Sequence, residues 1–167
     1  MLLAFDAHYH DTHSLLAAAS FYDWTDPVPL AMHTWRFGPA AAYEPGQFYR
    51  RELPLILQAL EDFPLAEIEA IVVDGYVYLD ANGRLGLGGH LYHELQQAAP
   101  VIGVAKSYFR DTNAEAVLRG KSTKPLYVTS YGIPQKVSAN HVRNMAGAFR
   151  MPDILGRVDR ASKEVEP

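Results

Sequence analysis

Three apolar and aromatic stretches lie close together at the start of the chain, and they constrain the fold more than any other feature. Their sequences are MLLAFDAHY (1–9), SLLAAASFYDW (14–24) and VPLAMHTWRF (28–37). Only the turn-like segments HDTH and TDP separate them. Apolar runs of strand length that are joined by short polar turns are typical of neighbouring antiparallel strands. The first 37 residues therefore predict a three-strand antiparallel meander.

The pattern changes after residue 45, where helices and strands alternate. A helix is predicted over 47–62, because apolar residues recur at helical spacing from Phe48 to Leu60. The later expected elements are a strand at 69–74, a helix at about 86–98, a strand at 101–105, a polar connection or short helix at 111–124, a strand at 126–130 and a helix from Ser138. A meander followed by this alternation predicts an RNase H-like α/β fold, a mixed β-sheet with added parallel strands and flanking helices.

Length and composition fit one domain. The chain has 167 residues, of which 49% are hydrophobic, so it is long enough for a sizeable core but too short for a (β/α)₈ barrel. We assign 1–160 to a single domain and 161–167 to a C-terminal tail. We expect a cytoplasmic protein, because no apolar run reaches membrane-span length and no basic leader begins the chain. Without cysteine, disulfides and thiolate zinc sites are excluded.

Charge is divided unevenly along the chain, although the net charge is only −4. Residues 1–103 hold 4 Lys/Arg and 13 Asp/Glu, whereas residues 104–160 hold 10 Lys/Arg and 4 Asp/Glu. The basic residues of 104–160 can attract phosphates, while the acidic residues of the first part can hold cations that bind those phosphates. This division of charge predicts nucleic acid as the partner. A solvated basic surface without any partner explains the same asymmetry.

Three carboxylates stand where a metal centre can form. Asp6 ends the apolar run LLAFD, Asp74 ends the run IVVD, and Glu52 lies in the predicted helix at 47–62. Carboxylates at strand ends can meet at one edge of a sheet, and a helix can bring a third one onto them. Such a set offers the oxygen ligands that Mg²⁺ and Mn²⁺ prefer. Each aspartate alone is also typical of a helix cap or turn.

Five stretches of the chain carry the motifs of one known family: FDAHY, YEPGQFYRRE, VVDGYVYLDANGRLGLGGHL, PVIGVAKSYF and, more weakly, MPDILGRVDRAS. Together they resemble the endonuclease V (deoxyinosine 3′-endonuclease) family. Their order and approximate spacing match the family pattern over almost the whole chain. The resemblance implies an RNase H-like fold and a Mg²⁺- or Mn²⁺-dependent endonuclease of DNA repair. It further implies cleavage of nucleic acid at the second phosphodiester bond 3′ to a deaminated purine, in DNA or in RNA.

The resemblance also implies roles for individual residues around the reacting phosphate. Asp6, Asp74 and Glu52 resemble the family's metal-binding and catalytic carboxylates, whose metal ion orients and activates a water molecule. Lys106 resembles the lysine after the family's Gly-Val-Ala strand, where its ammonium binds a phosphate oxygen or positions the water.

A second group of residues resembles the family's base-recognition elements. Tyr43, Pro45 and Gly46 resemble a wedge that enters the space left by a displaced base. Gly75 and the glycine-rich loop after it resemble the place where main-chain groups read the flipped hypoxanthine.

Two segments depart from the family pattern near the implied centre. The family shows Asp-Gly-His-Gly followed by a His-Pro-Arg loop, whereas this chain has DGYVYLDANGR, which contains Tyr76 and Asp80. The family's Ser-Pro-Gly-His-Arg loop is replaced by TSYGIPQ, which contains Tyr131. The match also starts directly at the first strand, without the leading helical segment of the family pattern. These changes leave open a catalytically impaired protein that still binds nucleic acid.

A third interpretation comes from the histidines in FDAHYHDTH. His8, His10 and His13 lie beside two aspartates, and a His-x-His pair after a first strand is typical of zinc-dependent hydrolases. The chain is too short for the barrel of one such class and lacks the His-x-His-x-Asp-His order of another. Two further residues are ambiguous. We expect His90 to pack or cap within its helix, and Asp159 either supports the site or forms a surface ion pair.

Overall fold

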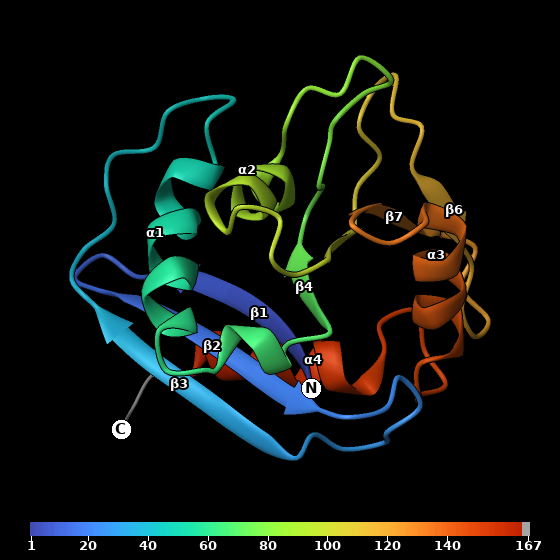
Figure 1. The fold of residues 1–167 in the computed structure, drawn as a ribbon, viewed down its shortest axis with the longest axis horizontal. Coiled ribbons are helices and arrows are strands. Elements are labelled where there is room, and N and C mark those ends of the chain that lie inside the picture. Colours follow the sequence, from blue (N-terminus) through green and yellow to red (C-terminus); the bar gives the residue numbers. More distant parts are fainter. Residues whose placement is uncertain (165–167) are drawn as a thin grey trace.

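The structure is a computed structural model that describes residues 1–164 (Figure 1). One seven-stranded sheet has the strand order β3-β2-β1-β4-β5-β7-β6. The strands are β1 (Leu2–Tyr9), β2 (Ser14–Phe21), β3 (Ala31–Phe37), β4 (Ala70–Asp74), β5 (Val101–Ala105), β6 (Glu115–Val117) and β7 (Leu126–Tyr131). The helices are α1 (Tyr49–Leu60), α2 (Leu87–Glu94), α3 (Gln135–Asn144) and α4 (Asp153–Lys163), with a 3₁₀ turn, η1, at Leu65–Glu67.

The first three strands form the predicted antiparallel meander. β1 pairs with β2 along its whole length, from Leu2 opposite Phe21 to Tyr9 opposite Ser14, and β2 pairs in turn with β3. A tight turn closes the first hairpin, where the amide of His10 donates to the carbonyl of His13 at 2.8 Å. All eight residues of β2 are buried, because both faces of the sheet are covered at this strand.

The middle of the sheet is parallel, and this arrangement positions the site. β1 pairs with β4 in parallel, with Phe5 opposite Val73, and β4 pairs with β5 in parallel, with Asp74 opposite Val104. The carboxyl ends of parallel strands meet at one edge of a sheet. Residues that follow these strands are therefore neighbours although they are far apart in sequence.

Helices cover both faces of the sheet (Figure 1). Because side chains alternate along a strand, Leu3 and Phe5 of β1 enter one core with Ile56 of α1, whereas Leu2 and Ala4 enter a second core with Ile154 of α4. Helix α2 lies over the first core with α1, and α3 lies over the second with α4. Burial of these apolar side chains is the main stabilising contribution to such a fold.

Some element boundaries differ from those predicted from the sequence. Helix α2 ends at Glu94 rather than near residue 98, because Gln96 and Gln97 adopt positive φ angles of 52° and 62°, which an α-helix does not tolerate. Helix α3 begins at Gln135, directly after Pro134, and not at Ser138. The short helix allowed for within 111–124 is wrong, because residues 115–117 form the edge strand β6 against β7.

Helix α4 is the last element in the described part of the chain. Helix α4 continues to Lys163, past the predicted domain boundary at residue 160, and residues 165–167 of the predicted tail lie outside the described part. The division into one domain and a tail stays a prediction. None of the helices within residues 1–164 combines the length and the apolar character needed to cross a bilayer.

Candidate active site

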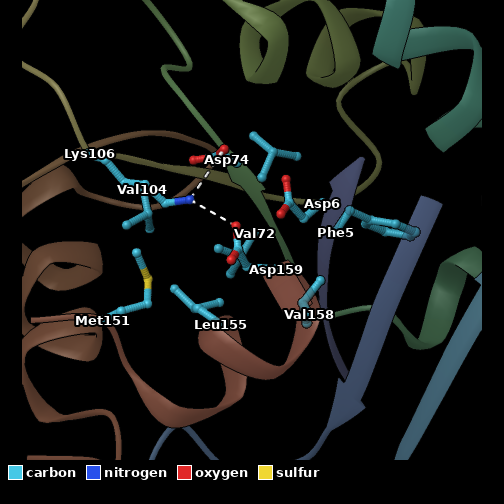
Figure 2. A pocket seen from close by; sticks show the side chains of 11 residues that line it. Phe5, Asp6, Val72, Asp74, Val104, Lys106, Met151, Leu155, Val158 and Asp159 are labelled. Atoms are coloured by element: carbon cyan, nitrogen blue, oxygen red, sulfur yellow. Dashed lines mark hydrogen bonds and ion pairs between the residues drawn. The ribbon is translucent and has the colours of Figure 1, made fainter. Parts of the chain in front are cut away.

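Asp6, Asp74 and Lys106 meet at the carboxyl edge of the parallel strands. Asp6 belongs to β1, Asp74 is the last residue of β4, and Lys106 directly follows β5. Figure 2 shows their side chains converging on one small region above helix α4. The strand order therefore explains why three residues spread over 100 positions can act together.

The ammonium of Lys106 binds two carboxylates. Its Nζ lies 3.8 Å from Oδ2 of Asp74 and 3.2 Å from Oδ1 of Asp159, as the dashed lines in Figure 2 mark. Burial lowers the pKa of Lys106, but the charges of Asp74 and Asp159 outweigh burial and raise it overall. Lys106 is therefore a permanent cation within an acidic cluster.

Asp6 is the most enclosed carboxylate at the strand ends. It is 9% exposed, and its oxygens accept hydrogen bonds from the Ala7 amide at 3.0 Å and the Ser162 hydroxyl at 3.3 Å. Burial, and then repulsion from Asp74, raises the pKa of Asp6 to about 7, against the opposing effect of Lys106. Asp6 thus titrates near neutral pH and favours a cation beside it.

Glu52 reaches the same region from the first turn of α1. Its Oε1 is buried and has no hydrogen-bond partner among residues 1–164. Burial, and then the charges of Asp6 and Asp74, raises the pKa of Glu52 well above its usual range. Asp74 raises the pKa of Asp6, and Asp6 and Asp74 together raise that of Glu52, so the three carboxyls lie close enough to interact electrostatically. Asp74 itself is 40% exposed, and its pKa is raised by desolvation.

Asp159 is the residue whose place the sequence left open. It extends from α4 into the site, where it contacts Lys106 and also accepts two hydrogen bonds of 2.9 Å from Lys163. The charge of Asp159 contributes to the raised pKa of both Asp6 and Asp74. The i, i+4 spacing of Asp159 and Lys163 is visible in the sequence, but it is equally typical of a surface ion pair.

Two cavities adjoin the carboxylates. The first is small, about 30 Å³, and lies between Asp6, Asp74, Lys106 and Asp159 on one side and the apolar residues Val72 and Leu155 on the other (Figure 2). This volume can hold one or two water molecules.

The second cavity, which we call the aromatic cavity, has a volume of about 350 Å³. Its lining residues come from the start of α1, the β4–α2 loop, the start of α2 and the segment after β5, and they are Gly46, Phe48, Tyr49, Glu52, Asp74, Gly75, Tyr76, Leu79, Leu85, Gly86, Leu87 and Phe109. Such a volume suits a flat, ring-shaped ligand with little charge. Since Glu52 and Asp74 line it, the aromatic cavity opens onto the carboxylates.

The predicted base-recognition residues are only partly collected around this cavity. Gly46 and Gly75 line it, with φ angles of +76° and +112° that favour glycine. Tyr43 and Pro45 do not line it, but they lie in the adjoining exposed loop, where the 51%-exposed Tyr43 ring contacts Phe48 at 5.2 Å between centroids. Sequence reasoning identified Tyr76 only as a departure from the family pattern and missed it as a candidate site residue, although it lines the cavity.

The histidines are engaged mainly with other rings. His10 lies 4.8 Å from His8 and 4.5 Å from His13 between ring centroids, and His90 stacks on Tyr49 at 3.7 Å, as expected for a packed helix residue. Within residues 1–164, no three histidine or acidic side chains are close enough together, as they stand, to bind one metal ion.

Comparison with known proteins shows which family this chain is similar to in sequence. The family model described as endonuclease V matches residues 1–147. The endonuclease V of Streptomyces coelicolor is 32% identical over 176 residues, which cover 92% of this chain and 74% of that protein. The endonuclease V of Xanthomonas oryzae is 32% identical over 182 residues, which cover 96% of this chain and 75% of that protein.

Solved structures share the fold at lower identity. Endonuclease V of Ciona intestinalis, in complex with a 24mer DNA containing an inosine followed by a ribo-adenosine, matches with a TM-score of 0.78 and 20% identity over 97% of this chain and 83% of that one. The catalytic domain of human endonuclease V matches with a TM-score of 0.78 and 17% identity over 97% and 80%. These neighbours confirm the predicted RNase H-like fold, and the family match confirms the predicted resemblance. The chain belongs to the endonuclease V family of nucleases.

Proposed function

We propose that the protein is a metal-dependent endonuclease that hydrolyses a phosphodiester bond 3′ to a deaminated purine in DNA. The observation that supports this most directly is that Asp74 lines both the aromatic cavity and the small cavity beside Lys106. A base held in the aromatic cavity would place its own strand next to the carboxylates. The Ciona relative, which shares the fold, was solved with inosine-containing DNA.

The carboxylates fit a hard divalent cation such as Mg²⁺ or Mn²⁺. Their donor atoms are all oxygens, Oε1 of Glu52 is buried without a partner, and the pKa values of Asp6 and Glu52 are raised in part by repulsion between carboxyls. Asp6 and Asp74 would bind the ion, with Glu52 joining directly or through a water, since Mg²⁺ usually keeps several waters and takes one or two carboxylates. When bound, the ion supplies charge stabilisation and a water of lowered pKa.

The residues of the chain then have distinct tasks. Lys106 would hold a phosphate oxygen near Asp74, because its ammonium already faces that carboxylate at 3.8 Å. Asp159, whose oxygen lies 3.2 Å from Lys106, would keep the ammonium aimed at the site. Asp6, whose pKa in the metal-free chain is about 7, must lose its proton to bind the ion, so metal binding would strengthen as the pH rises.

Base recognition would use the aromatic cavity and the exposed loop beside it. Gly75 and its neighbours would approach the flipped base closely through main-chain groups, while Tyr43, Pro45 and Gly46 would enter the gap left in the stack. Residues 104–160 contain 10 Lys/Arg and 4 Asp/Glu. Their excess positive charge would attract the phosphate backbone. Action on damaged DNA in the cytoplasm is part of this proposal.

Cleavage of end-labelled oligonucleotides tests the proposal. DNA and RNA strands, single and double, with and without one inosine, would be incubated in Mg²⁺, Mn²⁺ or EDTA with the wild type, Asp74→Asn and Asp111→Asn. Asp111 is a matched control, because its side chain is 83% exposed and pairs with Arg110. We expect a metal-dependent cut at the second phosphodiester bond 3′ to inosine in DNA, lost only in Asp74→Asn.

The other outcomes separate the alternatives. Cleavage of RNA alone would move the substrate from DNA to RNA. Inosine-dependent binding without cleavage of any strand would identify a recognition protein that has lost its chemistry. Neither binding nor cleavage would overturn the proposed function and leave only the family membership and the fold.

A further inference from the structure

Tyr76 spans the distance between the aromatic cavity and the backbone that carries Lys106. Tyr76 lines the cavity, and its ring meets that of Phe109, another lining residue, at 6.0 Å between centroids and an interplanar angle of 61°. Its hydroxyl donates a 2.6 Å hydrogen bond to the carbonyl of Ser107 and accepts a 3.0 Å bond from the amide of Phe109. Tyr76 therefore contacts both the aromatic cavity, which is the proposed base-binding site, and the main chain of Ser107 and Phe109.

The main chain of Tyr76 is held firmly in place. Its carbonyl accepts the amide of Gly88 at 3.1 Å, and the next amide, of Val77, donates to the Thr129 hydroxyl at 2.8 Å. A Cβ on Gly86 would come within 2.3 Å of the Tyr76 carbonyl oxygen, so the loop and the start of α2 pack without spare room. If the Tyr76 ring moves, its main chain has no room to shift with it. The movement therefore reaches the hydroxyl and the groups that this hydroxyl binds.

The segment from Lys106 to Phe109 is the part of the chain that a movement of the Tyr76 hydroxyl would affect. Lys106 places its ammonium among the carboxylates, and its carbonyl accepts a hydrogen bond from the guanidinium of Arg150. Ser107 and Tyr108 are exposed. Besides Arg150 and Tyr76, the segment is contacted by Tyr127, whose ring lies 5.6 Å from that of Tyr108, and by Arg84, whose guanidinium lies 5.4 Å from the Phe109 ring.

We propose that Tyr76 is a positioning and specificity residue, whose hydroxyl conveys the presence of a base in the aromatic cavity to the backbone that aims Lys106. This inference rests on the proposed function and adds to it a physical link between recognition and cleavage. A base stacked against Tyr76 would stabilise the two hydrogen bonds that its hydroxyl already makes, and these bonds would hold the segment after Lys106 in place. A strand that leaves the cavity empty would leave Lys106 less well held.

The variant Tyr76→Phe keeps the ring and removes only the hydroxyl. Its matched control is Tyr78→Phe on the same loop, because the Tyr78 hydroxyl binds Gln135 and its ring lines a different recess. We expect Tyr76→Phe to lower kcat on inosine-containing DNA about tenfold, to change KM less than about twofold, and to reduce the preference for inosine over adenosine strands by a similar factor. Tyr78→Phe should behave as the wild type does.

A double variant shows whether Tyr76 acts through the lysine. If it does, Tyr76→Phe should cost nothing further in a Lys106→Ala background, because the group being positioned is already absent. Hydrogen exchange at the Phe109 amide gives a measure that does not depend on activity. In Tyr76→Phe this amide should exchange faster, and the inosine strand should no longer protect it.

The outcomes separate this inference from the proposed function. If the wild type cleaves and Tyr76→Phe keeps both its rate and its base preference, the inference is overturned and the proposed function stands. Full additivity with Lys106→Ala would likewise overturn it. If the wild type neither binds nor cleaves inosine strands, the proposed function fails, and this inference fails with it.

Discussion

Oδ1 of Asp159 lies 3.2 Å from Nζ of Lys106, although the two residues are 53 positions apart. This contact is shorter than the 3.8 Å contact between Lys106 and Asp74. Helix α4 is thus part of the candidate active site, because it brings a second carboxylate to the ammonium that Asp74 contacts.

Asp159→Asn should lower cleavage of the inosine strand by about a hundredfold, because it removes one of the two carboxylates that orient Lys106. The charge of Asp159 also raises the pKa of Asp6, so the acidic limb of the pH–rate profile should move to lower pH in this variant. Steady-state kinetics from pH 5 to 9 would measure both effects against the control Asp111→Asn. An unchanged rate and profile would remove Asp159 from the site.

Lys106→Ala should depress turnover more than substrate binding. Under the proposed function the ammonium lies at the reacting phosphate, where loss of one charged donor costs about 10²–10³ in kcat. Lys163→Ala is the matched control, because its ammonium binds Asp159 and not Asp74. Single-turnover rates and binding in Ca²⁺ would be compared. Equal losses in both variants would argue that general charge, and not Lys106 itself, matters.

Glu52→Gln should separate stability from activity. The neutral amide has nearly the same shape, and it relieves a buried carboxyl whose pKa is raised by burial and by the charges of Asp6 and Asp74. We expect the metal-free variant to be more stable than the wild type by about 1–2 kcal/mol, and to lose metal-dependent cleavage. Urea denaturation in EDTA and oligonucleotide cleavage would measure the two properties. A destabilised variant that still cleaves would contradict both expectations.

The metal-free protein should become less stable as the pH rises from about 4 to 7. Asp6 has a usual pKa of 3.8 and a pKa of about 7 in the folded chain, so over this range the folded state holds a proton that the unfolded state releases. The loss is on the order of 4 kcal/mol and levels off above pH 7. Thermal unfolding in EDTA should show this slope, and Asp6→Asn should flatten it. A slope of the opposite sign would contradict the assignment.

Arg150→Gln should weaken both the fold and the reaction. The guanidinium donates to the carbonyls of Lys106, Lys124 and Pro125, and thereby ties the loop before α4 to the end of β5. Loss of these bonds should cost about 2–3 kcal/mol and lower kcat. Arg143→Gln is the control, because that guanidinium contacts Asn140 of its own helix. Denaturation midpoints and kcat would be compared, and equal values for the two variants would refute the role.

The sequence predicted those parts of the site that follow from local pattern. Asp6 and Asp74 were identifiable as candidates because each ends an apolar run in the sequence, and parallel pairing of β1 with β4 then makes them neighbours. Glu52 and Lys106 were recognisable from the motifs around them. Whether α4 would bring Asp159 to this edge of the sheet depends on packing between elements far apart in the chain, which no local pattern encodes.

Other features were missed for related reasons. β6 has three residues, which is too short for a strand periodicity to be visible. The early end of α2 depends on the backbone angles of Gln96 and Gln97, residues that ordinarily continue a helix. The role of the Tyr76 hydroxyl requires knowing that β5 lies beside β4.

The hydrogen bond between Ser162 and Asp6 joins residues 156 positions apart, almost the two ends of the described chain. During synthesis, Asp6 leaves the ribosome long before α4 exists, so the acidic sheet edge is made before Asp159 and Ser162 can complete it. A chain cut before α4 would therefore keep most of the sheet but lack these two groups. Under the proposed function, such a chain would not hydrolyse nucleic acid.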